Sequence, residues 1–137
     1  MTGASPTLLI SDDDRDLRET LGELFFRRGM EVVLAEDGEQ AIDLVSRVPV
    51  HVALLDLHMP KRTGLEVLEY LHDRQRDPGQ PRLACILMSA QLDELVVERA
   101  REVEVFRVQS KPFSIREIQS LVATALHDVH GWAENEN

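Results

Sequence analysis

The sequence predicts an α/β protein in which helices cover both faces of a parallel sheet. Strand-like and helix-like segments alternate along the chain, which is the pattern of a parallel sheet with helical crossovers. The segment 50–57 is apolar almost throughout, as expected of a strand that is covered on both faces. The length of 137 residues corresponds to about one domain. We therefore expect one domain built around a single sheet.

The predicted strands are short apolar runs that end in polar or turn-forming residues. They occupy residues 7–11, 30–35, 50–57, 83–88 and 105–110. Apolar residues spaced three and four apart predict helices at residues 14–28, 41–45, 64–73, 92–103 and from 115 onward. Ser114 and Glu117 have the spacing of a capping box at the start of the last helix. The polar segment 73–81 is expected to be a surface loop.

The composition limits the classes of function. The 25 acidic residues exceed the 15 Lys and Arg, which gives a net charge of −10. This charge disfavours direct binding to nucleic acid and fits a basic partner or a bound cation. Cys85 is the single cysteine and has no partner for an internal disulfide, so we expect a reduced, cytoplasmic protein. No apolar run approaches the ~20 residues of a membrane span, and no membrane contact is expected.

Polar or ionisable residues stand at the carboxyl ends of four of the five predicted strands. Asp12 and Asp13 follow the first strand, Asp56 lies near the end of the third, Ser89 follows the fourth and Lys111 follows the fifth. Each alone is an ordinary turn or cap residue, but the carboxyl ends of parallel strands meet at one edge, where ligands bind. Three carboxylates gathered there repel one another, and a divalent cation relieves the repulsion. Hard oxygen ligands in an incomplete cage suit Mg²⁺, and a nearby lysine can hold a phosphoryl group.

Four motifs carry a resemblance to a known family. The segments LLISDDD (8–14), LLDLHMPKRTG (54–64), ILMSA (86–90) and SKPF (110–113), in this order and spacing, resemble the receiver domain of two-component response regulators. The resemblance covers residues 6–128 and leaves residues 129–137 as a polar C-terminal tail. It implies a doubly wound, five-stranded parallel sheet with five helices, in a flavodoxin-like three-layer α/β/α sandwich.

The same resemblance implies a signalling phosphoacceptor rather than an enzyme with outside substrates. Such a domain accepts a phosphoryl group from a sensor histidine kinase or a phosphotransfer protein, promotes its own phosphorylation and dephosphorylation, and switches contacts with a downstream protein. By this resemblance Asp56 is the phosphoacceptor. The resemblance also implies that Asp12, Asp13 and Asp56 hold Mg²⁺ together with the backbone carbonyl of His58.

Further roles follow from the resemblance. Ser89 and Lys111 are expected to contact the phosphoryl group, and the peptide bond before Pro112 is expected to be cis. His58 and Gln91 lie two residues beyond Asp56 and Ser89, at positions that border the attacking water. They are expected either to tune the lifetime of the phosphoryl group or merely to face solvent.

The fifth strand departs from the family pattern. The family often has Tyr or Phe three residues before the lysine, whereas this chain has Val108 there and its nearest upstream aromatic residue is Phe106. Output therefore runs either through Phe106 or through helix rearrangement alone. A homodimer through the fourth helix and fifth strand is the self-association that the resemblance suggests.

Two other functions remain open from the sequence. A pseudo-receiver would use this fold as a docking module without phosphorylation, although the complete acceptor set argues against that reading. A cofactor carrier such as a flavodoxin would need a loop rich in Ser, Thr and Gly after the first strand, where this chain is acidic. Too few residues follow the fifth strand for an output domain, so we expect action through protein–protein contacts.

Overall fold

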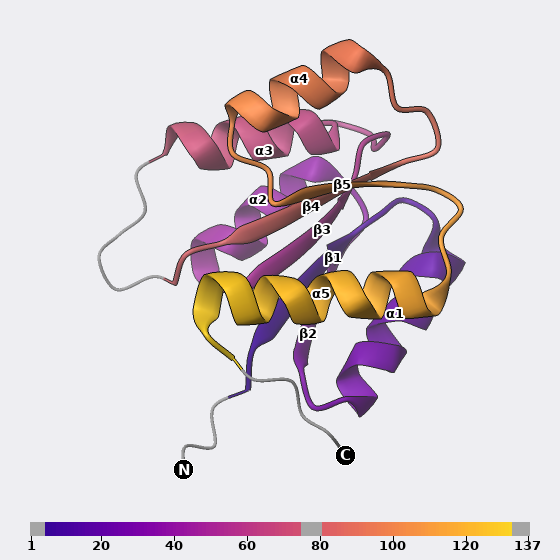
Figure 1. Ribbon diagram of the computed structural model, residues 1–137, viewed down its shortest axis with the longest axis vertical. Coiled ribbons are helices and arrows are strands. Elements are labelled where there is room, and N and C mark those ends of the chain that lie inside the picture. Colours follow the sequence, from indigo (N-terminus) through magenta and orange to yellow (C-terminus); the bar gives the residue numbers. More distant parts are fainter. Residues whose placement is uncertain (1–4, 75–80, 133–137) are drawn as a thin grey trace.

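Five parallel strands form a single sheet in the order β2-β1-β3-β4-β5, with helices on both faces (Figure 1). The structure is a computed structural model that describes residues 5–74 and 81–132. The strands are β1 (Thr7–Ser11), β2 (Glu31–Ala35), β3 (Val52–Asp56), β4 (Ala84–Ser89) and β5 (Arg107–Ser110). The predicted doubly wound, flavodoxin-like three-layer sandwich is confirmed.

The helices divide between the two faces of the sheet. They are α1 (Arg15–Arg27), α2 (Gly38–Arg47), α3 (Gly64–Asp73), α4 (Glu94–Glu102) and α5 (Ile115–His130). Helices α1 and α5 cover one face, while α2, α3 and α4 cover the other (Figure 1). The hydrophobic core is accordingly split into two clusters by the sheet. Alternate residues of β1 and β3 serve the two clusters, as the period of a strand requires.

Each helix begins at a side chain that accepts a hydrogen bond from a backbone N–H group of the first turn. The five capping residues are Asp14, Asp37, Thr63, Asp93 and Ser114. The capping box of Ser114 and Glu117 is confirmed, with hydrogen bonds of 2.8 and 3.0 Å. A second capping box joins Thr63 to Glu66 at the start of α3. These caps fix where the loops at the carboxyl ends of the strands finish.

The observed boundaries refine the predicted ones. Strand β3 begins at Val52 rather than at residue 50, and α4 begins at Glu94 because Asp93 caps it. Helix α5 ends at His130, where Gly131 adopts a left-handed φ of 71°. Most of the predicted loop 73–81 and residues 133–137 of the predicted tail lie outside the described residues. Of the helices that the structure describes, none combines the length and apolar character needed to cross a bilayer.

Candidate functional site

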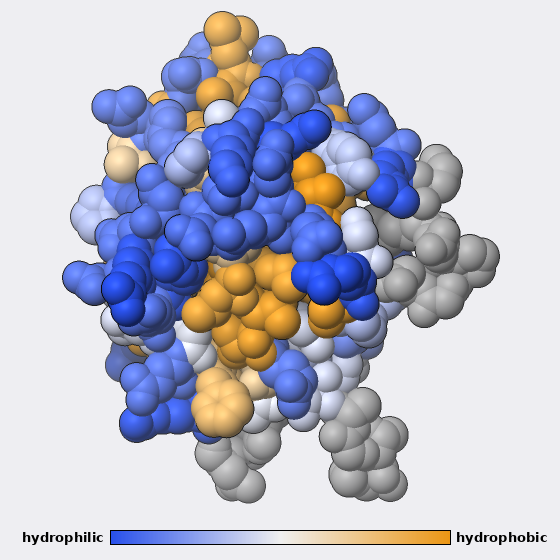
Figure 2. Space-filling view, turned by 180° about the vertical axis from the view of Figure 1, so that it is seen from behind, coloured by the Kyte–Doolittle hydropathy of each residue, from blue (hydrophilic) through white to orange (hydrophobic). Residues whose placement is uncertain are grey.

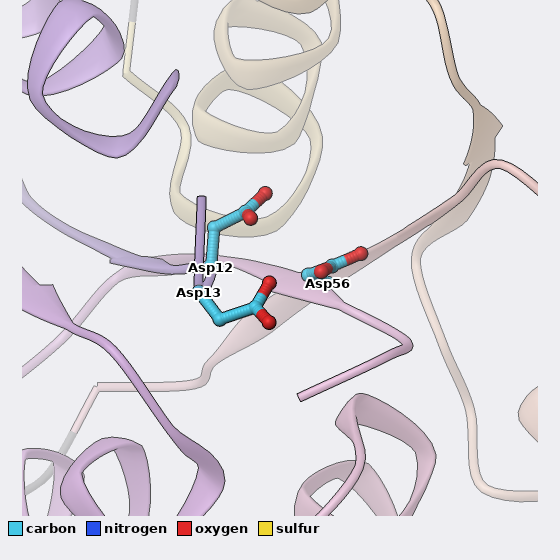
Figure 3. Close-up of side chains that lie close together, drawn as sticks. All are labelled: Asp12, Asp13 and Asp56. Atoms are coloured by element: carbon cyan, nitrogen blue, oxygen red, sulfur yellow. The ribbon is translucent and has the colours of Figure 1, made fainter. Parts of the chain in front are cut away.

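Three carboxylates meet at the carboxyl edge of the sheet. Strand β1 pairs with β3 in a register that sets Ser11 beside Leu55, so the residues that end both strands are neighbours. One ligand oxygen from each of Asp12, Asp13 and Asp56 lies within 4.8 Å of the others. Figure 3 shows the three side chains close together at these two strand ends. Asp12 and Asp56 are buried and Asp13 is exposed. The structure thus brings together the acidic residues that the sequence singled out.

Lys111 supplies the positive charge of this cluster. Its Nζ lies 2.8 Å from Oδ2 of Asp12 and 3.3 Å from Oδ1 of Asp56. The backbone N–H of Lys111 donates to the carbonyl of Ser89 at 2.8 Å, which ties the end of β5 to the end of β4. The peptide bond between Lys111 and Pro112 is cis, as predicted. Lys111 therefore spans from the fifth strand to both buried carboxylates.

The electrostatics of the cluster make the ionised form of Asp56 costly in the absence of a cation. Burial and the charge of Asp12 raise the pKa of Asp56 to about 6, although Lys111 opposes this rise. Burial alone would lower the pKa of Lys111, but the hydrogen bond and charge of Asp12, with the charge of Asp56, raise it above its ordinary value. Lys111 is therefore a fixed cation, and a further positive charge nearby would stabilise the ionised form of Asp56.

The donor set fits a hard divalent cation. All three acidic side chains offer carboxylate oxygens, the ligands that Mg²⁺ prefers. Asp12 is already oriented, because its Oδ1 accepts the backbone N–H of Asp14 at 2.9 Å. Asp13 is exposed, so an ion held here stays open to water and to substrate oxygens. One ammonium facing three carboxylates leaves an excess of negative charge for a cation to neutralise.

The hydroxyl of Ser89 is engaged within its own turn. It donates to the carbonyl of Gln91 at 3.0 Å and accepts the Gln91 N–H at 2.9 Å. Ser89 is fully buried at the end of β4, in register with Ser110 of β5. Ser89 lies at the carboxyl end of its strand, as the sequence predicts, but nothing in the sequence indicates that this local turn holds the hydroxyl.

The loop after Asp56 packs too tightly to admit side chains at two glycines. A Cβ atom on Gly64 would lie 2.3 Å from the Asp56 carbonyl oxygen, and one on Gly38 would lie 2.3 Å from the Arg62 carbonyl oxygen. Lys61 in this loop has a φ of 69°, and its ammonium lies 3.7 Å from Asp37. The start of α2 thus contacts the loop that follows the phosphoacceptor candidate, Asp56. His58 is exposed in that loop.

Two contacts at the site were not foreseen from the sequence. Nη1 of Arg18 donates to the Asp12 backbone carbonyl at 2.7 Å, which holds the turn between β1 and α1 from the helix side. The buried hydroxyl of Ser11 donates to the sulfur of Met59 at 3.0 Å and links the end of β1 to the loop after β3. Arg18 lies four residues after Asp14, the cap of α1. This position, one turn into the helix, is the only feature of the sequence that could have indicated the contact with Asp12.

Comparison with known proteins identifies the family. The family model described as "Response regulator receiver domain" matches residues 8–123. The chain belongs to this family. Receiver domains are signalling phosphoacceptors of two-component systems that bind Mg²⁺ at an acidic pocket, and in this receiver domain Asp12, Asp13 and Asp56 form the acidic cluster.

Relatives of this receiver domain include free-standing and longer proteins. The chain is 33% identical over 129 residues to the transcriptional regulatory protein CpxR of Escherichia coli K12, with 94% of this chain and 52% of that protein covered. It therefore spans about half the length of that relative. It is 29% identical over 116 residues to a probable chemotaxis protein CheY of Rhizobium etli, with 84% of this chain and 88% of that protein covered.

Solved structures support the fold of the receiver domain. A CheY-like receiver domain protein from Methanospirillum hungatei has a TM-score of 0.84 at 20% identity, with 93% of this chain and 98% of that one covered. The signal receiver domain of an HD domain-containing protein from Pseudomonas fluorescens has a TM-score of 0.81 at 25% identity, with 94% and 100% covered.

Proposed function

We propose that this receiver domain accepts a phosphoryl group on Asp56 in a Mg²⁺-dependent reaction and thereby switches its contacts with a downstream protein. The phosphodonor is a sensor histidine kinase or a phosphotransfer protein. The observation that carries the proposal is the position of Asp56, which is buried beside Asp12 and Asp13 and paired with Lys111. The receiver unit is taken as residues 6–128.

The chemistry is a single in-line displacement at phosphorus. A carboxylate oxygen of Asp56 forms a new O–P bond as the bond from phosphorus to the donor's histidine nitrogen breaks, and the histidine leaves with that electron pair. Asp12, Asp13, Asp56 and the carbonyl of His58 would hold Mg²⁺, which when bound supplies positive charge next to the phosphoryl oxygens. Lys111 donates a hydrogen bond to one of these oxygens as negative charge gathers there.

Phosphorylation of Asp56 can be sensed by the hydroxyl of Ser89. The acyl phosphate brings additional negative charge and new acceptor oxygens to Asp56. To donate to them, the Ser89 hydroxyl must release the Gln91 carbonyl, to which it is bonded at 3.0 Å. This exchange of acceptors moves the turn between β4 and α4, because Gln91 is part of that turn.

The output surface proposed here comprises α4 and β5. Phe106 precedes β5, packs partly against the core, and lies beneath the guanidinium of Arg107, whose Cζ is 4.6 Å from the ring centroid. Leu95 on α4 is 75% exposed. A homodimer through α4 and β5 belongs to the same proposal. If Phe106 relays the signal, then Phe106→Ala removes the phosphorylation dependence of partner binding, whereas unchanged dependence assigns the relay to the helices.

We also propose that this receiver domain acts in the cytoplasm and that its partners are proteins. A net charge of −10 repels the phosphate backbone of nucleic acids, so direct binding to DNA or RNA is not part of it. A role as a pseudo-receiver docking module is the second candidate. It is less favoured because Lys111 and the three carboxylates form a connected cluster that a docking module does not require.

Intact mass spectrometry after incubation with a small phosphodonor tests the proposal. With phosphoramidate and Mg²⁺, the parent protein is expected to gain the mass of one phosphoryl group. The gain is expected to vanish in Asp56→Asn and in the presence of EDTA. Asp43→Asn is a matched control, because Asp43 is exposed and pairs with Arg47 on α2, away from the cluster. An unmodified parent protein would favour the pseudo-receiver.

A further inference from the structure

Strand β2 forms an open edge of the sheet. Its inner side is bonded to β1 at both ends: the Glu31 N–H donates to the Pro6 carbonyl at 2.9 Å, and the Asp12 N–H donates to the Ala35 carbonyl at 3.1 Å. Hydrogen-bonding direction alternates along a strand, so Val32 and Leu34 point their N–H and C=O groups away from β1. Within residues 5–74 and 81–132 no further strand pairs with this edge.

This edge lacks the features that usually prevent strand pairing. Edge strands are commonly protected by lysines, prolines or bulges. β2 has the sequence EVVLA, and its one charged residue is Glu31 at the start. Its register with β1 is continuous over all five residues, without a bulge. The backbone of β2 is therefore free to template another strand.

The surface around β2 is apolar. Leu34 is 41% exposed and Phe26 at the end of α1 is 69% exposed, while Val32 and Val33 are half-buried. Gly22 lies against the side chains of Leu34 and Val32, and Phe26 follows one helical turn later on the same side of α1. Figure 2, the view from behind Figure 1, shows hydrophobic side chains gathered on the surface in the region of β2. We call Phe26 and residues 32–34 the β2 patch.

We propose that the β2 patch binds a second copy of this chain by antiparallel pairing of the two β2 strands about a two-fold axis at Val33. In this register Val32 lies opposite Leu34 of the second copy, and the outward N–H and C=O groups of these two residues bond to each other on both sides of the axis. Val33 lies opposite its own copy in the non-hydrogen-bonded pair. The two sheets then become one continuous sheet.

The occupant is a second copy because this register is self-complementary in charge and in apolar character. Glu31 falls opposite Ala35, so the one charged side chain of the strand never meets its own copy. Val32 and Leu34 share the α1 side of the sheet, where Phe26 of each copy adds an aromatic ring to the contact. Val33 of each copy meets on the α2 side. An isologous interface requires this kind of self-matching.

The proposed dimer is separate from the phosphoacceptor chemistry. Antiparallel β2 strands direct the carboxyl ends of the two sheets in opposite directions, so both acidic clusters stay open to a phosphodonor. The edge strand β5 lies at the far side of the sheet, so α4 and β5 stay free in both copies. Self-association through β2 is therefore expected with and without phosphorylation.

Sedimentation velocity of the full chain from micromolar to millimolar concentration tests the dimer. The parent is expected to dimerise reversibly, and Val33→Lys is expected to abolish the dimer by placing two ammonium groups opposite each other. Ile115→Lys at the start of α5 is the matched control, because Ile115 is 41% exposed and lies outside the β2 patch, and this variant is expected to dimerise like the parent. A parent that stays monomeric throughout, or a dimer that Val33→Lys leaves intact, would overturn the proposal.

Cysteine cross-linking tests the register even if Val33→Lys fails to fold, as circular dichroism would reveal. Under oxidised glutathione, Val33→Cys is expected to form a disulfide-linked dimer, because Val33 lies opposite itself. Val32→Cys and Leu34→Cys each face a different residue and are expected to cross-link far less. The parent, whose buried Cys85 is its single cysteine, is the background. Equal or stronger linking at residue 32 or 34 would contradict the register, and no linking at any of the three would contradict the interface.

Discussion

The ammonium of Lys111 lies 2.8 Å from the buried carboxylate of Asp12, although 99 positions separate the two residues in the chain. The contact joins the end of β5 to the end of β1 across β3 and β4. It places a fixed cation next to the carboxylates that would hold a metal ion. Lys111 and Mg²⁺ therefore compete for the negative charge of one cluster. This competition can be tested by measuring the affinity for Mg²⁺ when Lys111 is neutralised.

Lys111→Met is expected to bind Mg²⁺ more tightly than the parent, by about three- to tenfold, because a positive charge near the metal ligands is removed. Isothermal titration calorimetry measures the dissociation constant directly. Lys61→Met serves as the control, since Lys61 is largely exposed and pairs with Asp37 rather than with the cluster. Weaker binding in Lys111→Met would show that the lysine organises the carboxylates instead of competing for them.

Arg18→Met is expected to lower the free energy of unfolding by about 1–2 kcal/mol, because it removes a charge-assisted hydrogen bond to the Asp12 carbonyl. Arg15→Met, three residues earlier, removes only an exposed pair with Glu19 and is expected to change the free energy of unfolding far less. Urea denaturation followed by circular dichroism compares the two. Equal losses in both variants would mean that the Arg18 contact does not hold the turn.

Asp56→Asn is expected to stabilise the metal-free protein at neutral pH by about 1–3 kcal/mol. The folded state raises the pKa of Asp56 from 3.8 to about 6, so the protonated acid is stable within the fold and the carboxylate is costly. Protonated Asp56 therefore contributes to the free energy of unfolding of the parent. This contribution is fully present below about pH 4 and is lost as the pH rises through about 6. The asparagine variant has no such loss.

The pH dependence of thermal stability tests this prediction. Thermal unfolding in EDTA is expected to show the two proteins converging below about pH 4, separating between about pH 4 and 6, and staying apart at higher pH. Asp43→Asn, which neutralises an exposed carboxylate on α2, is expected to follow the parent. A constant difference between the parent and Asp56→Asn at every pH would place the effect outside the titration of Asp56.

His58→Ala and Gln91→Ala are expected to change the half-life of the phosphorylated protein, because both positions follow a residue of the phosphoacceptor site by two. His58 and Gln91 are exposed beside the buried Asp56 and Ser89, where water would approach. Loss of phosphoryl mass with time, after removal of the phosphodonor, gives the half-life. Half-lives equal to that of the parent would assign both side chains to solvent alone.

Much of the site was predictable because a parallel sheet converts position along the chain into position in space. Apolar runs identified the strands, and the polar residues at the carboxyl ends of β1, β3, β4 and β5 had to meet at one edge. The β1 and β3 register then brought Asp12 and Asp56 together as expected. The starts of the helices were predicted less accurately. For example, the apolar pattern places the start of α4 two residues too early, because Asp93 caps this helix.

Contacts that depend on side-chain direction were not predictable in this way. Nothing in the periodicity of α1 indicates that Arg18 turns back to the Asp12 carbonyl, and Ser11 gives no sequence signal of its bond to Met59. Ser89 ends β4 as predicted, yet the partner of its hydroxyl is the Gln91 backbone in its own turn. Each of these contacts is set by packing between distant segments or by a local turn, which a pattern of residue types does not encode.

Borohydride reduction followed by peptide mass spectrometry tests the central claim most directly, because it converts an aspartyl phosphate to homoserine at the residue that carried it. After incubation with phosphoramidate and Mg²⁺, homoserine is expected at position 56 alone, although Asp12 and Asp13 lie beside it in the same cluster. Homoserine at position 12 or 13, or at none of the three, would contradict the assignment of Asp56 as the phosphoacceptor.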